Sequence, residues 1–173
     1  MGQSGVLLDL LVLAAAYAAW LLPKWRRLGK RPLLVYTLMY GCLAGIVRFT
    51  LMPVLTALPY CFDHPYIPMH MAPFEDVILH HGDYVRQIVL NVILFVPFGV
   101  LLPLCDRCRG RRPRFWRCLL LALALSAGIE VVQPLLHSFR SSDITDVITN
   151  TIGGVFGYAL WALGNVCCKK RQG

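Results

Sequence analysis

Residues 84–137 have the sequence YVRQIVLNVILFVPFGVLLPLCDRCRGRRPRFWRCLLLALALSAGIEVVQPLLH, in which two apolar stretches flank a short connection rich in arginine. A helix needs about 20 mostly apolar residues to cross the hydrocarbon core of a bilayer, which is about 30 Å thick. Each stretch is long enough and apolar enough to do so. The region therefore predicts two membrane-spanning helices joined by a basic turn.

The composition of the whole chain agrees with this prediction. Of its 173 residues, 57% are apolar and 15% are charged, whereas soluble domains carry about 25% charged residues. A soluble fold of this size would lack the polar residues needed to cover its surface, which disfavours a soluble enzyme, a disordered protein and a disulfide scaffold. We predict an integral membrane protein with a single domain over residues 1–173.

Five segments meet the length and composition requirement, including the two above. The predicted spans are about Gly5–Leu22, Leu33–Thr56, Tyr84–Leu104, Cys118–His137 and Ile144–Val166. The expected fold is therefore an all-α, polytopic bundle of five transmembrane helices. The first span precedes its basic cluster instead of following one, so we expect an uncleaved anchor and not a signal peptide.

The basic residues predict the orientation of the bundle. Fourteen of the 17 Lys and Arg residues fall in KWRRLGKR at 24–31, in DRCRGRRPRFWR at 106–117 and in the KKR of the tail, whereas residues 57–83 contain none. Because Lys and Arg concentrate in cytoplasmic connections, the N-terminus is predicted outside and the C-terminus inside. The net charge of +8 then indicates contact with anionic membrane lipids, and no nucleic-acid partner is expected.

Polar residues inside the predicted spans gather at one depth. With this topology they all lie in the outer halves of the spans or at their outer ends: Asp9, Arg48, Arg86, Gln87, Asn91, Glu130, Gln133, Asp143, Asp146 and Asn150. A charged residue at the centre of a membrane helix costs about 2.5–3.5 kcal/mol, so such residues usually pair and face the bundle interior or a wet cavity. We therefore expect a polar pocket that opens outward.

The spacing of these residues supports convergence. Glu130, Gln133 and His137 share one helix face, and Asp143, Asp146 and Asn150 repeat the same spacing on the next helix. The short connection between the two helices predicts an antiparallel hairpin in which the two polar faces meet.

Two further features bear on how the helices pack. Pro134 lacks the N–H that would bond to the carbonyl of Glu130, so a kink and a free acceptor are expected there. Gly153 and Gly157 form a G-x-x-x-G pattern, which favours close helix packing, with approach of a ligand to bare backbone as the alternative.

Several motifs together resemble the VanZ-like family over residues 36–160. They are NVILFVPFG at 91–99, E-x-x-Q at 130–133 and R-x-x-D-x-x-D-x-x-x-N at 140–150, with weaker matches in RFT at 48–50 and MAPF at 71–74. The resemblance implies a small multi-pass protein of the bacterial cell membrane, associated with low-level resistance to the glycopeptide teicoplanin. It also implies functional importance for the matched residues Asn91, Pro97, Gly99, Glu130, Gln133, Arg140, Asp143, Asp146 and Asn150.

Three functional hypotheses and one structural alternative follow. The first is a non-enzymatic protein that binds a lipid-linked cell-wall precursor, a lipid headgroup or a glycopeptide, with the ligand-binding residues Arg48, Asn91, Glu130, Gln133, Arg140, Asp143, Asp146 and Asn150. The second is an intramembrane enzyme acting on a lipid-linked substrate, with Glu130 as acid or base and Asp143 and Asp146 assisting. The third is a small transporter. The structural alternative is an ion-paired core with Arg48 against Glu130 or Asp146.

Metal and cofactor chemistry is not expected from the remaining motifs. Residues 63–83 contain four histidines among acids, but no spacing matches a known metal motif such as H-E-x-x-H. The C-x-x-C at 105–108 has no second copy in the chain, so the seven cysteines are expected to be reduced structural thiols.

Overall fold

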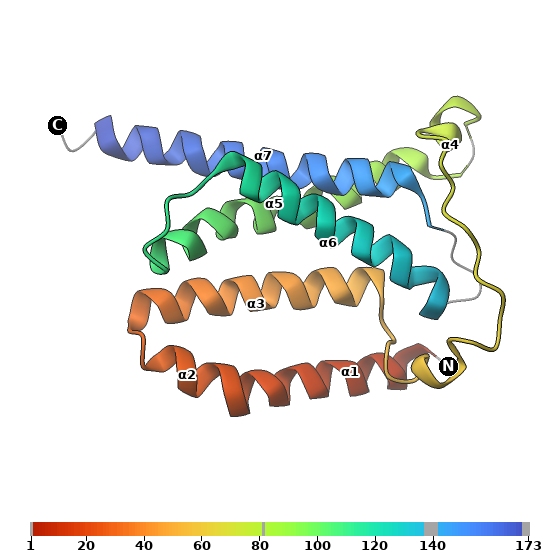
Figure 1. The fold of residues 1–173 in the computed structure, drawn as a ribbon, viewed down its shortest axis with the longest axis horizontal. Helices are drawn as coiled ribbons and strands as arrows, with labels where there is room; N and C mark the ends of the chain where they lie inside the picture. Colours follow the sequence, from red (N-terminus) through yellow and green to blue (C-terminus); the bar gives the residue numbers. More distant parts are fainter. Residues whose placement is uncertain (1, 81, 137–141, 171–173) are drawn as a thin grey trace.

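The computed structural model describes residues 2–80, 82–136 and 142–170, and this part of the chain is helical with no strand. Five long helical segments run alternately in opposite directions (Figure 1). They are α1 (Gly2–Ala16) continued by the π-helical η1 (Tyr17–Leu21) and α2 (Leu22–Arg26), then α3 (Lys30–Thr50), α5 (Tyr84–Cys108), α6 (Phe115–Leu136) and α7 (Ile144–Lys170). Two short elements, η2 (Leu58–Tyr60) and α4 (Glu75–Ile78), lie between α3 and α5.

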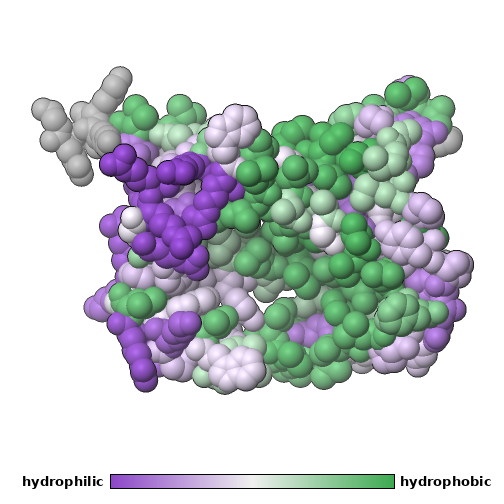
Figure 2. All heavy atoms as spheres, in the orientation of Figure 1, coloured by the Kyte–Doolittle hydropathy of each residue, from purple (hydrophilic) through white to green (hydrophobic). Residues whose placement is uncertain are grey.

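Within the described ranges, five helices are long and apolar enough to cross a membrane, which confirms the predicted all-α fold. Figure 2 shows a broad hydrophobic region between two ends where hydrophilic residues gather. Large apolar side chains cover the outside of the bundle, among them Trp20 at 77% exposed and Phe49 at 68%. Apolar surface on this scale is unfavourable in water and suits a bilayer.

The two ends of the bundle differ in their charges. Residues 24–31 and 106–117, which carry nine of the 13 arginines, lie at the same end of the bundle as the C-terminal part of α7 (Figure 1). We call this the basic end. The start of α1 and residues 51–80 lie at the opposite end, which we call the polar-cluster end. The alternation on which the predicted topology depends is therefore present, and the assignment of either end to the outside stays a prediction.

The second helix ends six residues before its predicted end, at Thr50 and not at Thr56. Pro53 accounts for this, because proline has no N–H to donate and disfavours helical backbone in the residue before it. At the basic end, α5 and α7 extend four residues past their predicted ends, to Cys108 and Lys170. Arg and Lys side chains can reach the headgroup region from such extensions.

The closest helix contact is between α5 and α7 and depends on glycine. A Cβ added at Gly99, Gly153 or Gly157 would lie closer than 3.0 Å to backbone atoms of the other helix. The G-x-x-x-G pattern is thus confirmed as a packing motif. A core around Ile46, Phe95 and Ile129 joins α3, α5 and α6 beside this contact.

Candidate functional site

The first turn of α7 organises a group of polar residues at the polar-cluster end. Asp143 precedes the helix, and its Oδ1 accepts a hydrogen bond of 2.7 Å from the backbone N–H of Thr145. This is the capping interaction expected of an aspartate before a helix. The group, which we call the polar cluster, consists of Gln87 and Asn91 on α5, Ser126 and Glu130 on α6, and Asp143, Asp146 and Asn150 at the start of α7.

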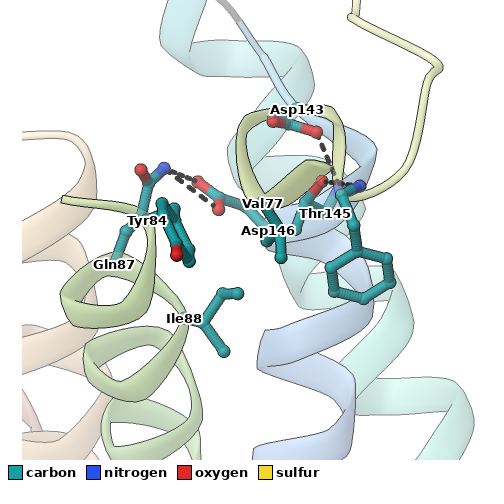
Figure 3. Close-up of a pocket in the computed structure, with 8 residues that line it drawn as sticks. Val77, Tyr84, Gln87, Ile88, Asp143, Thr145 and Asp146 are labelled. Carbon is teal, nitrogen blue, oxygen red and sulfur yellow. Dashed lines mark hydrogen bonds between the residues drawn. The ribbon is translucent and has the colours of Figure 1, made fainter. Parts of the chain in front are cut away.

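Asp146 is bound by amide side chains from the neighbouring helix. Nδ2 of Asn91 donates to its Oδ1 at 2.7 Å. Nε2 of Gln87 lies 3.3 and 3.4 Å from the two carboxylate oxygens (Figure 3). The carboxylate also lies in the first turn of α7, where the helix dipole favours a negative charge. Asp146 thus joins α5 to α7 through hydrogen bonds between side chains.

Glu130 is buried, at 1% exposed, and connects α6 to the start of α7. Its Oε2 accepts a hydrogen bond of 3.1 Å from the backbone N–H of Asp143. Its backbone carbonyl accepts a hydrogen bond from the hydroxyl of Ser142. That carbonyl is the one freed by Pro134, so the predicted free acceptor exists and Ser142 occupies it.

A second pair of residues links α6 and α7 one turn deeper. Nδ2 of Asn150 donates to the hydroxyl oxygen of Ser126 at 2.9 Å, and this hydroxyl lies 3.5 Å from the backbone carbonyl of Asp146. Asn150 is 2% exposed. Polar side chains of α6 and α7 therefore meet here. Of the predicted α6 face, Glu130 takes part in this contact and Gln133 binds α3 instead, while His137 lies outside the described residues.

Two other predicted ligand-binding residues point elsewhere. Nε2 of Gln133 donates to the carbonyl of Thr50 at 3.2 Å and so satisfies the end of α3. Arg48 is exposed, and its guanidinium carbon lies 5.8 Å from the ring centroid of Phe49. The described ion pairs do not include Arg48, so the proposed pairing with Glu130 or Asp146 is not found. Arg140 lies outside the described residues.

Residues 70–74 are attached to the start of α7. The backbone N–H of His70 donates to the carbonyl of Ser142 at 2.8 Å, and the backbone N–H of Ile144 donates to the carbonyl of His70 at 3.1 Å. The N–H of Phe74 donates to the hydroxyl of Thr145 at 2.9 Å. Ser142 and Thr145 are not among the predicted site residues, although a serine or threonine near a helix start is a known capping signal.

Two hollows adjoin the polar cluster. A small pocket lies between α4, α5 and the start of α7 (Figure 3), lined by Phe74, Val77, Tyr84, Gln87, Ile88, Asp143, Thr145 and Asp146. A larger groove of about 670 Å³ lies between α3 and α5, lined by Phe49, Thr50, Asp83, Arg86, Gln87, Leu90, Asn91, Ile93 and Leu94. Gln87 lines both hollows. The hydrogen bond between Asn91 and Asp146 joins the wall of the groove to the wall of the pocket.

The groove changes character along α5. Leu90, Ile93 and Leu94 are apolar, whereas Asp83 and Arg86 lie one to two turns nearer the helix start. A molecule with an apolar chain and a polar head would find matching surfaces along this groove.

The described histidines and cysteines do not form the metal site that their residue types could supply. Nε2 of His70 lies 2.7 Å from a carboxylate oxygen of Glu75, and Nδ1 of His80 lies 3.1 Å from the hydroxyl of Tyr84. Among the described residues, no three or more His, Cys, Asp and Glu side chains form a group that could hold a metal ion. The six cysteines whose side chains are described are free thiols.

These features define a small all-helical membrane protein with a hydrogen-bonded polar cluster where α7 begins. The family model described as VanZ/LLP1 matches residues 43–165, and the chain belongs to this family. The match begins within α3 and includes the whole polar cluster. The chain is also 34% identical, over 111 residues, to Protein VanZ of Enterococcus faecium.

This alignment covers 64% of the chain and 63% of Protein VanZ, so the chain matches less than two thirds of that relative's length. No solved structure matches the chain. The family predicted from the sequence motifs is confirmed.

Proposed function

We propose that this chain is a multi-pass protein of the bacterial cell membrane that binds an amphipathic ligand of the cell envelope at the polar cluster. The polar part of the ligand, which belongs to a lipid-linked cell-wall precursor, a lipid headgroup or a glycopeptide, contacts the residues around Asp146. The apolar part lies in the groove between α3 and α5. By binding this ligand the protein contributes to low-level teicoplanin resistance.

The observation that carries the proposal is the position of the Asn91–Asp146 hydrogen bond. It joins Asn91, which lines the groove, to Asp146, which lines the pocket, and Gln87 lines both hollows. Side-chain amides and carboxylates can exchange their hydrogen-bond partners for groups on a ligand, whereas backbone pairs within a helix cannot do so without unfolding the helix. The neighbouring cation at Arg86 and the anion at Asp83 add charges of both signs.

The predicted topology supports an outward position for this site. With the basic end inside, the polar cluster faces the side on which cell-wall precursors are used and glycopeptides act. Asp146 lines the pocket, and Glu130 positions the start of α7 that carries Asp146. Their neutral counterparts should therefore lose the function with the smallest change in shape.

The test compares Glu130→Gln and Asp146→Asn with the wild-type chain in a teicoplanin-sensitive bacterial host. Each variant is expected to lose the protection given by the wild type, while the amount of folded protein in the membrane is measured in parallel. Asp63→Asn is the matched control, because Asp63 is an exposed acid at the same end and lines neither hollow. Unchanged susceptibility with both variants folded would contradict the proposal.

A second experiment tests binding directly. Purified protein in nanodiscs is titrated with a lipid-linked cell-wall precursor and, separately, with teicoplanin, and native mass spectrometry counts the bound molecules. Binding that is lost in Asp146→Asn and kept in Asp63→Asn supports the proposal. Chemical conversion of the precursor would instead favour the enzymatic hypothesis with Glu130 as acid or base.

A further inference from the structure

A separate hollow lies at the basic end, far from the polar cluster. It has a volume of about 510 Å³ and is lined by residues at the end of α2, the start of α3 and the end of α5. Figure 1 shows these three helix ends on the same side of the bundle. Its lining residues are Lys24, Trp25, Leu28, Pro32, Tyr36, Cys108 and Arg109. The wall therefore combines two cations with two aromatic rings.

One of the aromatic rings, Tyr36, contacts one of the cations, Arg109. The ring centroids of Trp25 and Tyr36 are 5.5 Å apart, and the guanidinium carbon of Arg109 lies 5.7 Å from the centroid of Tyr36. Tyr36 is buried, at 8% exposed, so it is a fixed support. A guanidinium carries five N–H donors in its own plane, and attraction to a ring face uses the charge and not these donors.

The excess of positive charge at the basic end favours an anionic partner. Residues 24–31 carry five basic residues and no acid, and residues 106–117 carry six arginines and one acid, Asp106. Asp106 is buried and paired with Arg117. Within the part of the chain that the structure describes, Lys24 and Arg109 form no ion pair. Their charges are thus available to a ligand.

We propose that this hollow binds the phosphate headgroup of an anionic phospholipid from the adjacent leaflet. Basic pockets between transmembrane helices bind such headgroups, and tryptophan is typical of the membrane interface. Leu28 and Pro32 add apolar wall beside the cations, which fits the glycerol and upper acyl chain of a lipid better than a free phosphate ion. This site is independent of the function proposed for the polar cluster.

Cys108 provides a local reporter, because it lines the hollow and is a free thiol. The protein is placed in nanodiscs of phosphatidylcholine alone or with added phosphatidylglycerol, and alkylation by a maleimide is followed by peptide mass spectrometry. Phosphatidylglycerol is expected to slow alkylation of Cys108 at least fivefold. Cys167 is an exposed thiol on α7, so its rate should stay constant.

The variants separate this pocket from the general positive charge. Lys24→Gln with Arg109→Gln should abolish the protection of Cys108, whereas Lys24→Arg should keep it. Arg27→Gln with Arg112→Gln removes the same charge at residues that do not line the hollow, and should keep most of the protection. Circular dichroism confirms that each variant is folded.

Three outcomes would overturn the proposal. Equal slowing at Cys108 and Cys167 would mean that the lipid only alters reagent access at this surface. Equal loss in the two glutamine pairs would mean that diffuse charge attracts the lipid. Equal protection by soluble glycerol phosphate would mean that the site takes a water-soluble phosphate ester.

Discussion

Two acids, one in each part of the bundle, have different hydrogen-bond partners. Asp9 belongs to the hairpin of α1–α2 with α3, and Asp146 belongs to the three-helix unit of α5, α6 and α7. Oδ2 and Oδ1 of Asp9 accept hydrogen bonds from the backbone N–H groups of Val54 and Leu55, at 2.5 and 3.0 Å. Asp146 instead accepts from the side chains of Asn91 and Gln87. An acid bound by backbone fixes a turn, whereas an acid bound by side chains beside a hollow can bind a ligand.

The two regions also differ in packing. The first helix exposes large apolar residues such as Leu7, Leu11 and Trp20, whereas α5 and α7 meet at their backbones through glycine. The family match begins at residue 43 and so omits the first helix. The site that we propose thus lies in the three-helix unit and within the family match, whereas the first helix lies outside that match.

The largest expected effect concerns the contact between α5 and α7. Gly157→Ala should destabilise the protein by about 3 kcal/mol or more, because the added Cβ meets the backbone of α5 and overpacking alone costs about 1–3 kcal/mol. Gly164→Ala on the same helix is the control, since its Cβ meets nothing within 4 Å. The check is the thermal unfolding midpoint in detergent. Equal midpoints for the two variants would show that the helices do not approach as described.

An intermediate effect is expected at the first helix. Asp9→Ala should cost about 2 kcal/mol, because two backbone donors lose their acceptor, and should leave ligand binding at the polar cluster unchanged once the folded protein is purified. Asp63→Ala, at an exposed acid, should change neither quantity. The midpoint and the native mass spectrum of each variant give the answer. Loss of binding in folded Asp9→Ala would remove the distinction between the two acids.

The smallest effect tests the carbonyl of Glu130. Ser142→Ala should cost about 1 kcal/mol, the usual net contribution of a hydrogen bond. In a Pro134→Ala background the restored N–H at position 134 can satisfy the same carbonyl, so Ser142→Ala should cost less than about 0.5 kcal/mol. Unfolding midpoints of the four proteins form a double-mutant cycle. Equal costs in both backgrounds would mean that Pro134 and Ser142 act independently.

The sequence allowed much of the fold to be predicted, because hydrocarbon thickness sets helix length and composition shows where the chain can cross. The pairing of α6 with α7 followed from their short connection, and the glycine contact from the spacing of Gly153 and Gly157. Pro53 could also have predicted the early end of α3, but the apolar residues that follow it suggested that the span continues.

Side-chain direction was less predictable than depth. Position along a helix gives the depth of Arg48, but the rotation of α3 about its axis decides what Arg48 faces, and this depends on packing against α5. The rotation of α5 likewise decides that Asn91 and Gln87 donate their hydrogen bonds to Asp146. Their i, i+4 spacing predicted a shared face and not its partner. Asp9 meets a segment 45 residues away, a contact that local patterns do not encode.

The attachment of residues 70–74 to the start of α7 gives the polar-cluster end a mechanical linkage. Any movement of the segment at His70 or Phe74 pulls on Ser142 and Thr145, and Thr145 directly precedes Asp146. Force applied to this surface segment therefore reaches the carboxylate through hydrogen bonds without passing through the apolar core. The segment and the first turn of α7 should consequently shift as one body.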